Sequence, residues 1–149
     1  MNKSRRAGIA VALAGLLAVP AFAQSVGQLK VSTGPVFIER ADERVPAPVG
    51  TGVQAADTIV TGADAAAGVT FIDNSRMSLG PNSTLAVGRF NFNATTHEGN
   101  FDSNLKKGTL SVVSGKLAKR SPEAMTVSTP STILGVRGTE FVVEAEAAE

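Results

Sequence analysis

The residue types that most often carry chemistry in proteins are scarce in this sequence. It has 149 residues, no Cys and a single His, His97, which is followed directly by Glu98. Without Cys there is no thiolate nucleophile, disulfide or Cys-ligated metal site. His97 and Glu98 could form half of a metal site or an acid–base pair, but such sites need two or three convergent groups. We therefore expect a solvated loop at this point, no cofactor and no enzymatic activity.

A group of basic side chains is the second candidate for chemistry. Its members fall within fifteen residues of one another: Lys106, Lys107, Lys116, Lys119 and Arg120. If these residues flank a hairpin that contains residues 109–113, both parts of the group lie at the same end of it. One interpretation is a partner-binding surface formed by Lys116, Lys119 and Arg120. The alternative is that cations at strand ends prevent edge-to-edge aggregation.

The charge balance restricts the classes of partner. The chain has 14 Lys and Arg against 13 Asp and Glu, and three of the cations lie within its first six residues. A chain without that basic start is slightly acidic, so binding to nucleic acid through bulk charge is not expected. The length supports one domain with one core.

The first 23 residues have the three parts of a secretory signal peptide. A basic start (Lys3, Arg5, Arg6) precedes an uncharged apolar run over 7–19, and Pro20 then precedes Ala-Phe-Ala. This pattern predicts cleavage after Ala23 and a mature domain over 24–149 that is periplasmic or secreted. An uncleaved membrane anchor is the alternative, but the apolar run is shorter than the ~20 residues that a spanning helix needs.

The rest of the sequence predicts strands. Val, Ile, Thr and Phe recur in short alternating runs that Gly, Pro, Asn and Asp separate, which favours an antiparallel sandwich or a β-solenoid. The expected strands are 28–32, 36–40, 58–60, 68–72, 76–79, 84–87, 101–105, 109–113, 125–128 and 140–145. We expect residues 32–35 to close a hairpin, 41–57 to be an extended connection, and 91–104 to be an exposed loop or loose hairpin.

Several segments, taken in order, resemble a known family. They are DTIVTG (57–62), VTFIDNS (69–75), MSLGPNSTL (77–85), LKKGTL (105–110), VSTP (127–130) and GVRGTEF (135–141). Their content and order resemble the FecR domain, from about Gly27 to Val143. The resemblance implies an all-β periplasmic module of the kind found in iron-transport anti-sigma regulators and in stand-alone exported bacterial proteins.

The motif residues have structural roles in this interpretation: Asp57, Gly62, Asp73, Asn74, Ser75, Gly135, Arg137, Gly138, Thr139 and Phe141. The two late glycines would allow a bulge or close backbone approach before the last strand. We expect Arg137 to pair with a carboxylate such as Asp57 or Asp73. Phe141 should be buried, with Glu140 and Glu144 facing water.

The sequence departs from the family pattern at two points. Asn74 stands where the family usually has Gly, and Asn tolerates the same positive φ. The classical regulators carry a cytoplasmic segment and a membrane helix, where this chain has the expected signal peptide. The leading hypothesis is therefore a non-catalytic envelope protein that binds an unknown protein or ligand, with a role in signalling or regulation. The alternative is a structural or assembly component of a surface or secretion-linked complex. The sequence predicts neither the partner nor the oligomeric state.

Overall fold

The computed structural model describes residues 23–137 and 140–147, and these ranges hold twelve strands and one short helix. The strands are β1 (Ser25–Thr33), β2 (Val36–Arg40), β3 (Glu43–Pro46), β4 (Gly52–Gln54), β5 (Thr58–Thr61), β6 (Ala66–Phe71), β7 (Arg76–Leu79), β8 (Thr84–Phe92), β9 (Gly99–Val113), β10 (Met125–Ser128), β11 (Ile133–Gly135) and β12 (Glu140–Ala145). The helix is α1 (Lys116–Arg120). No helix of the described residues is long and apolar enough to span a membrane. The expected signal peptide, up to residue 22, lies outside the described residues, as do Gly138 and Thr139.

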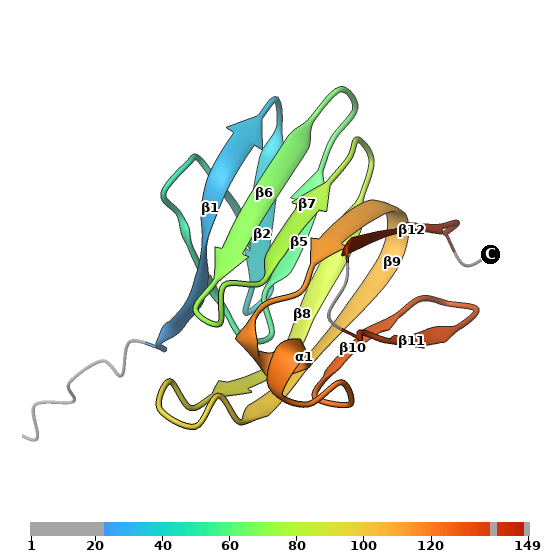
Figure 1. The fold of residues 1–149 in the computed structure, drawn as a ribbon. Coiled ribbons are helices and arrows are strands. Elements are labelled where there is room, and N and C mark those ends of the chain that lie inside the picture. The colour runs from blue at the N-terminus through green and yellow to red at the C-terminus, as the bar shows by residue number, and fades with distance from the viewer. Residues whose placement is uncertain (1–22, 138–139, 148–149) are drawn as a thin grey trace, which may run out of the picture.

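The strands form one curled sheet, a half-barrel (Figure 1). Its order is β3-β2-β5-β8-β9-β7-β6-β1-β4, and on the other side of β9 lie β12 and the β10–β11 pair. All pairings are antiparallel except that of β10 with β9. The expected all-β antiparallel architecture is confirmed.

Strand β9 joins the two halves of the sheet. Its first part pairs with β8, and its second part pairs with β7 and β12. The chain bends at Gly108, whose φ of 94° is in the left-handed region that favours glycine. The separate strands expected at 101–105 and 109–113 are thus one strand, because Ser83 Oγ accepts the N–H of Thr109 (3.0 Å) at the bend and no turn is formed.

Other differences from expectation come from pairing that local sequence does not specify. Residues 32–35 do not close a hairpin, since β1 pairs with β4 and β6 while β2 pairs with β3 and β5. Within 41–57, expected as an extended connection along an edge, β3 and β4 form ladders with β2 and β1 and are the two end strands of the order. The β2–β3 turn has Ala41 and Asp42 at positive φ, as a two-residue hairpin turn requires. The hairpin expected within 91–104 is confirmed as the end of β8, a loop over 93–98 and the start of β9.

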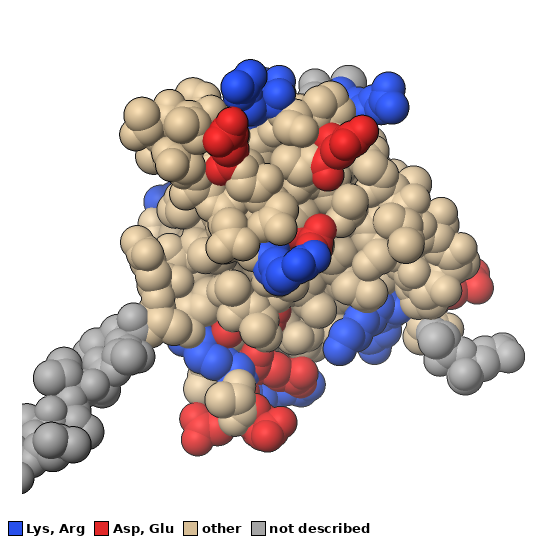
Figure 2. All heavy atoms as spheres, turned by 90° about the horizontal axis from the view of Figure 1, so that it is seen from below, with Lys and Arg blue, Asp and Glu red and all other residues tan. Residues whose placement is uncertain are grey.

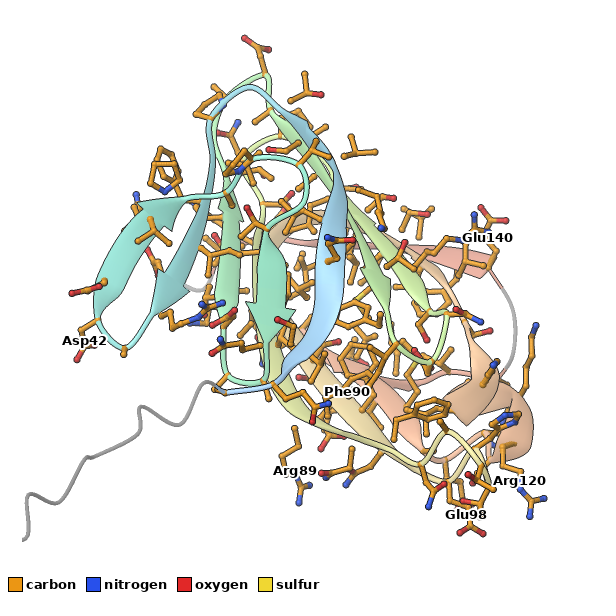
Figure 3. All side chains as sticks on the ribbon, turned by 90° about the vertical axis from the view of Figure 1, so that its left-hand side faces the viewer. Asp42, Arg89, Phe90, Glu98, Arg120 and Glu140 are labelled. Atoms are coloured by element: carbon orange, nitrogen blue, oxygen red, sulfur yellow. The ribbon has the colours of Figure 1, made fainter. Side chains whose placement is uncertain are left out.

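The core lies inside the curl. Alternation along the strands turns one side chain in two inward, so Val69 and Phe71 on β6 are buried together, as are Leu110 and Val112 on β9. The rings of Phe71, Phe90 and Phe101 pack with centroids 4.7 to 5.7 Å apart. This aromatic cluster lies where β6, β8 and β9 face one another, and Figure 3 shows Phe90 directed into it.

Candidate functional site

Asp57, the first of the motif residues, is 1% exposed and forms a two-pronged ion pair with Arg40. Arg40 Nε donates to Asp57 Oδ1 (2.8 Å) and Nη2 donates to Oδ2 (2.6 Å). The backbone N–H of Gln54 also donates to Oδ2 (2.8 Å), and Arg40 Nη2 reaches the carbonyl of Gly52 (3.1 Å). The hydrogen bond to Asp57 raises the pKa of Arg40, although partial burial opposes the shift. The pair ties β2 to the β4–β5 turn.

Arg137 does not have the role expected for it. It is exposed, and the Asp57 carboxylate binds Arg40, while that of Asp73 binds hydroxyl and backbone groups. Arg40 lies seventeen residues before Asp57 and outside every motif, so no local pattern indicates the pairing.

The Asp73-Asn74-Ser75 turn joins β6 and β7 and is held by hydrogen bonds within the turn and to the segment before α1. Asn74 has φ of 67°, which confirms that Asn occupies the left-handed position. Asp73, fully buried, accepts from the Ser75 N–H (3.0 Å) and the Ser75 hydroxyl (2.6 Å). The turn therefore closes on itself through the aspartate.

The same turn also fixes the start of α1. Ser75 Oγ accepts the N–H of Gly115 (3.0 Å), and the carbonyl of Asp73 accepts the N–H of Lys116 (2.7 Å). A Cβ on Gly115 would overlap the Asp73 carbonyl and the Ser75 nitrogen, so only glycine fits there. Gly115 was missed by sequence reasoning because its partners lie some forty residues away.

Gly62 and the residues beside it fix the position of the turn that precedes β8. The Gly62 N–H donates to the Pro35 carbonyl (2.9 Å), and a Cβ on Gly62 would lie 2.7 Å from Pro35 Cγ. Thr61 Oγ1 donates to the Gly80 carbonyl (2.6 Å) and accepts the N–H of the buried Ser83 (2.9 Å). These bonds connect β5 to the β7–β8 turn, and Ser83 Oγ in that turn accepts the N–H of Thr109 at the bend of β9.

The closing GVRGTEF segment differs from the expectation at two residues. Gly135 is exposed, and a Cβ placed on it would have nothing within 4 Å, so close backbone approach does not explain this glycine. Phe141 is only half-buried against the core, because β12 is an edge strand; Val143 is the buried residue of β12. The outward orientation of Glu140 and Glu144 is confirmed. Val136, 1% exposed, also anchors the segment in the core.

The basic residues do not gather at one end of a hairpin. Lys106 and Lys107 lie at the bend of β9, whereas α1, which carries Lys116, Lys119 and Arg120, follows the far end of that strand. The extended segment 108–113 separates the two groups. On the face that Figure 2 shows, Lys and Arg alternate with Asp and Glu, so the charges of the described residues on that face form no broad area of one sign.

His97 and Glu98 lie in the exposed β8–β9 loop. The His97 ring stacks on Phe92, with centroids 6.0 Å apart, and Glu98 lies 3.9 Å from Arg120. Figure 3 shows Glu98 and Arg120 side by side at the surface. In the described residues, no three His, Cys, Asp or Glu side chains lie together as a metal site would require.

Taken together, the motif side chains form three internal clasps: Arg40–Asp57, the Asp73–Ser75 turn with Gly115, and Thr61–Ser83 with the β9 bend. Every buried side-chain nitrogen or oxygen of the described residues has a hydrogen-bond partner. The buried polar side chains of the motifs thus bind other parts of the fold and hold its strands together. Surface hollows remain, among them one of about 690 Å³ between the end of β12 and the β10–β11 turn.

Comparison with protein families assigns residues 57–149 to the family described as FecR protein. No curated protein and no solved structure matches the chain. The matched region begins at the buried Asp57 and includes every residue of the three clasps except Arg40. The chain belongs to the FecR family.

Proposed function

We propose that this protein is a non-catalytic binding module of the bacterial cell envelope, exported by a signal peptide that is removed after Ala23. It binds another envelope protein or a ligand in a signalling or regulatory setting. Membership of the FecR family supports that setting. The export features of residues 1–23 support the location.

The observation that carries the proposal is the use of the motif residues. Asp57, Asp73, Ser75 and Ser83 are buried, and their polar atoms bind other groups of the same fold. A catalytic centre needs polar groups directed at a substrate. Here the same residues make a rigid sheet, and recognition is left to surface side chains and strand edges.

Affinity capture tests the proposal. The mature protein, immobilised and exposed to envelope extract of the source cells, is expected to retain one stoichiometric partner. Ser75→Ala with Gly115→Val, which should unfold the α1 region, is the control for capture by a damaged domain. Failure of the folded protein to retain any protein or small ligand contradicts the proposal. Export is tested separately by mass spectrometry of the cellular protein, which should begin at Gln24.

A structural or assembly role is the second candidate, and the edge strands of the sheet favour it. A strand with one unpaired side is a template for pairing with another chain. Light scattering of the purified protein separates the two functions: concentration-dependent growth beyond a small defined oligomer supports assembly, and a constant mass supports the binding module.

A further inference from the structure

We propose that the free edge of β12 binds an extended segment of a partner protein that carries basic residues at positions i and i+4 with apolar residues between them. The segment adds one strand to the sheet. This inference rests on the proposed function as a binding module and names the surface and the chemistry of its partner.

The edge strands of the described sheet differ in how well they could accept another strand. The strand order leaves β3, β4, β11 and β12 at edges. Strand β3 ends in Pro46, while β4 and β11 have three residues each and contain Gly52 and Gly135. Proline and very short strands block edge pairing. Strand β12 has six residues, no Pro and no Gly, and among the described strands it pairs with β9 alone.

The side chains of β12 match an uncovered edge on both faces. Phe141 and Ala145 point inward but remain half-buried, since none of the described strands lies beyond them. On the outer face Val142 is 66% exposed between Glu140 and Glu144. Figure 3 shows Glu140 directed away from the sheet at the margin of the molecule. An added strand would cover Phe141 with its inward side chains and Val142 with its outward ones.

Space is present where β12 ends. The hollow of about 690 Å³ is lined by Pro130 and Ser131 of the β10–β11 turn and by residues 144–147. A chain that pairs with β12 and continues past the end of the strand would enter this hollow, beside the β10–β11 turn.

The acidic residues argue against a second copy of this protein as the occupant. Antiparallel pairing of β12 with itself about a two-fold axis places Glu140 opposite Glu144 in the register centred on Val142. In the register centred on Val143, Glu140 faces Glu146. Like charges directly opposite each other destabilise a strand pair. A partner with cations at i and i+4 instead places one cation opposite each of Glu140 and Glu144, because side chains on one face recur every second residue.

Peptide binding tests the proposal directly. The probe is the fluorescent peptide TKVVVKT with blocked ends, and the comparison peptide TEVVVET has the opposite charges. Fluorescence anisotropy with the purified mature protein should show binding of TKVVVKT, with TEVVVET at least about tenfold weaker. Hydrogen exchange should slow at residues 140–145 when TKVVVKT binds. Absence of binding, or protection at another part of the sheet, overturns the proposal.

Charge reversal distinguishes pairing at the β12 edge from nonspecific electrostatic attraction between the peptide and the protein. The double substitution Glu140→Lys and Glu144→Lys should invert the preference, so that TEVVVET binds better. The matched control, Glu43→Lys and Glu123→Lys, makes the same change in net charge at exposed residues elsewhere and should leave the preference unaltered. Alternate N–H groups of the bound peptide point to its two edges, and only one of these edges pairs with β12. N-methylation of the nitrogens on the paired edge should abolish binding, and N-methylation of those on the other edge should not. An unchanged preference in the Glu140, Glu144 variant, or no effect of N-methylation on either edge, overturns strand addition.

The proposed function and the β12 inference can be refuted independently of each other. If the Glu140→Lys, Glu144→Lys variant captures the same envelope partner as the wild type, the β12 inference is wrong and the binding module stands. If TKVVVKT binds at β12 but the wild type captures no partner or ligand, the proposed function is wrong and the edge chemistry stands. A wild-type dimer joined through β12 overturns the choice of a basic partner.

Discussion

At the scale of single residues, Ser75 shows how a motif side chain acts at a distance. Its hydroxyl donates to Asp73 and accepts the N–H of Gly115, so it joins the β6–β7 turn to the start of α1. Ser75→Ala should lower the free energy of unfolding by about 1–3 kcal/mol, because the buried N–H of Gly115 loses its acceptor and the Asp73 carboxylate loses the shorter of its hydrogen bonds at Oδ2. Ser78→Ala, on the exposed face of β7, should change it by less than about 0.5 kcal/mol. Urea denaturation followed by circular dichroism measures both; equal effects would contradict the clasp.

Ala56 offers a prediction of the opposite sign. Its φ of 69° is in the left-handed region, where an alanine Cβ approaches the following carbonyl oxygen. Ala56→Gly should therefore raise the free energy of unfolding by up to about 1 kcal/mol. Ala86→Gly, in the extended backbone of β8, should lower it by about 0.5–1 kcal/mol. Thermal melting of the two variants should shift in opposite directions, and a lower melting temperature for Ala56→Gly counts against this account.

At the scale of elements, β12 shows that the alternation of side chains along a strand does not by itself determine how deeply they are buried. The sequence correctly predicts which residues share a face, but Phe141 is half-buried where full burial was expected, because burial depends on a neighbouring strand. Phe141→Ala should lower the free energy of unfolding by less than the ~3–5 kcal/mol expected for a fully buried phenylalanine. Phe101→Ala, at a side chain with 0% exposure, should show that full loss. Denaturation in urea compares the two; an equal loss would mean that β12 is covered in solution.

The other elements show where sequence was sufficient. Strands such as β6 and β7 were located because alternating apolar residues and a turn with Asn74 mark them locally. Strand β3 is not marked locally, because the turn before it has Ala41 and Asp42 at positive φ and lacks the usual glycine or asparagine. Strand β4 is not marked because its ladder forms with β1, which is distant in sequence. The same reason applies to the clasps. Asp57, Asp73 and Ser75 were identified from the motif, but their partners Arg40 and Gly115 are distant in sequence and carry no motif of their own.

At the scale of the whole molecule, β9 makes the two halves of the sheet interdependent. Sheet neighbours on both sides of the bend at Gly108 pair with this one strand: β8 before it, and β7 and β12 after it. A half-barrel built in this way has no boundary at which one half could unfold while the other keeps its central strand. We therefore expect a single cooperative unfolding transition.

Gly108→Ala tests this coupling. The residue has φ of 94°, and a Cβ there would overlap the side chain of Ser83, which holds the bend by accepting the N–H of Thr109. The substitution should lower the free energy of unfolding by about 2–4 kcal/mol, through backbone strain and overpacking together. Methyl NMR signals of Val53 in β4 and Val36 in β2, two buried residues near opposite ends of the strand order and in different halves of the sheet, should lose intensity at the same urea concentration. Gly135→Ala is the matched control, expected to be neutral because its Cβ meets nothing within 4 Å. Separate midpoints for the two valines in Gly108→Ala would show that the halves fold independently and that β9 does not unite them.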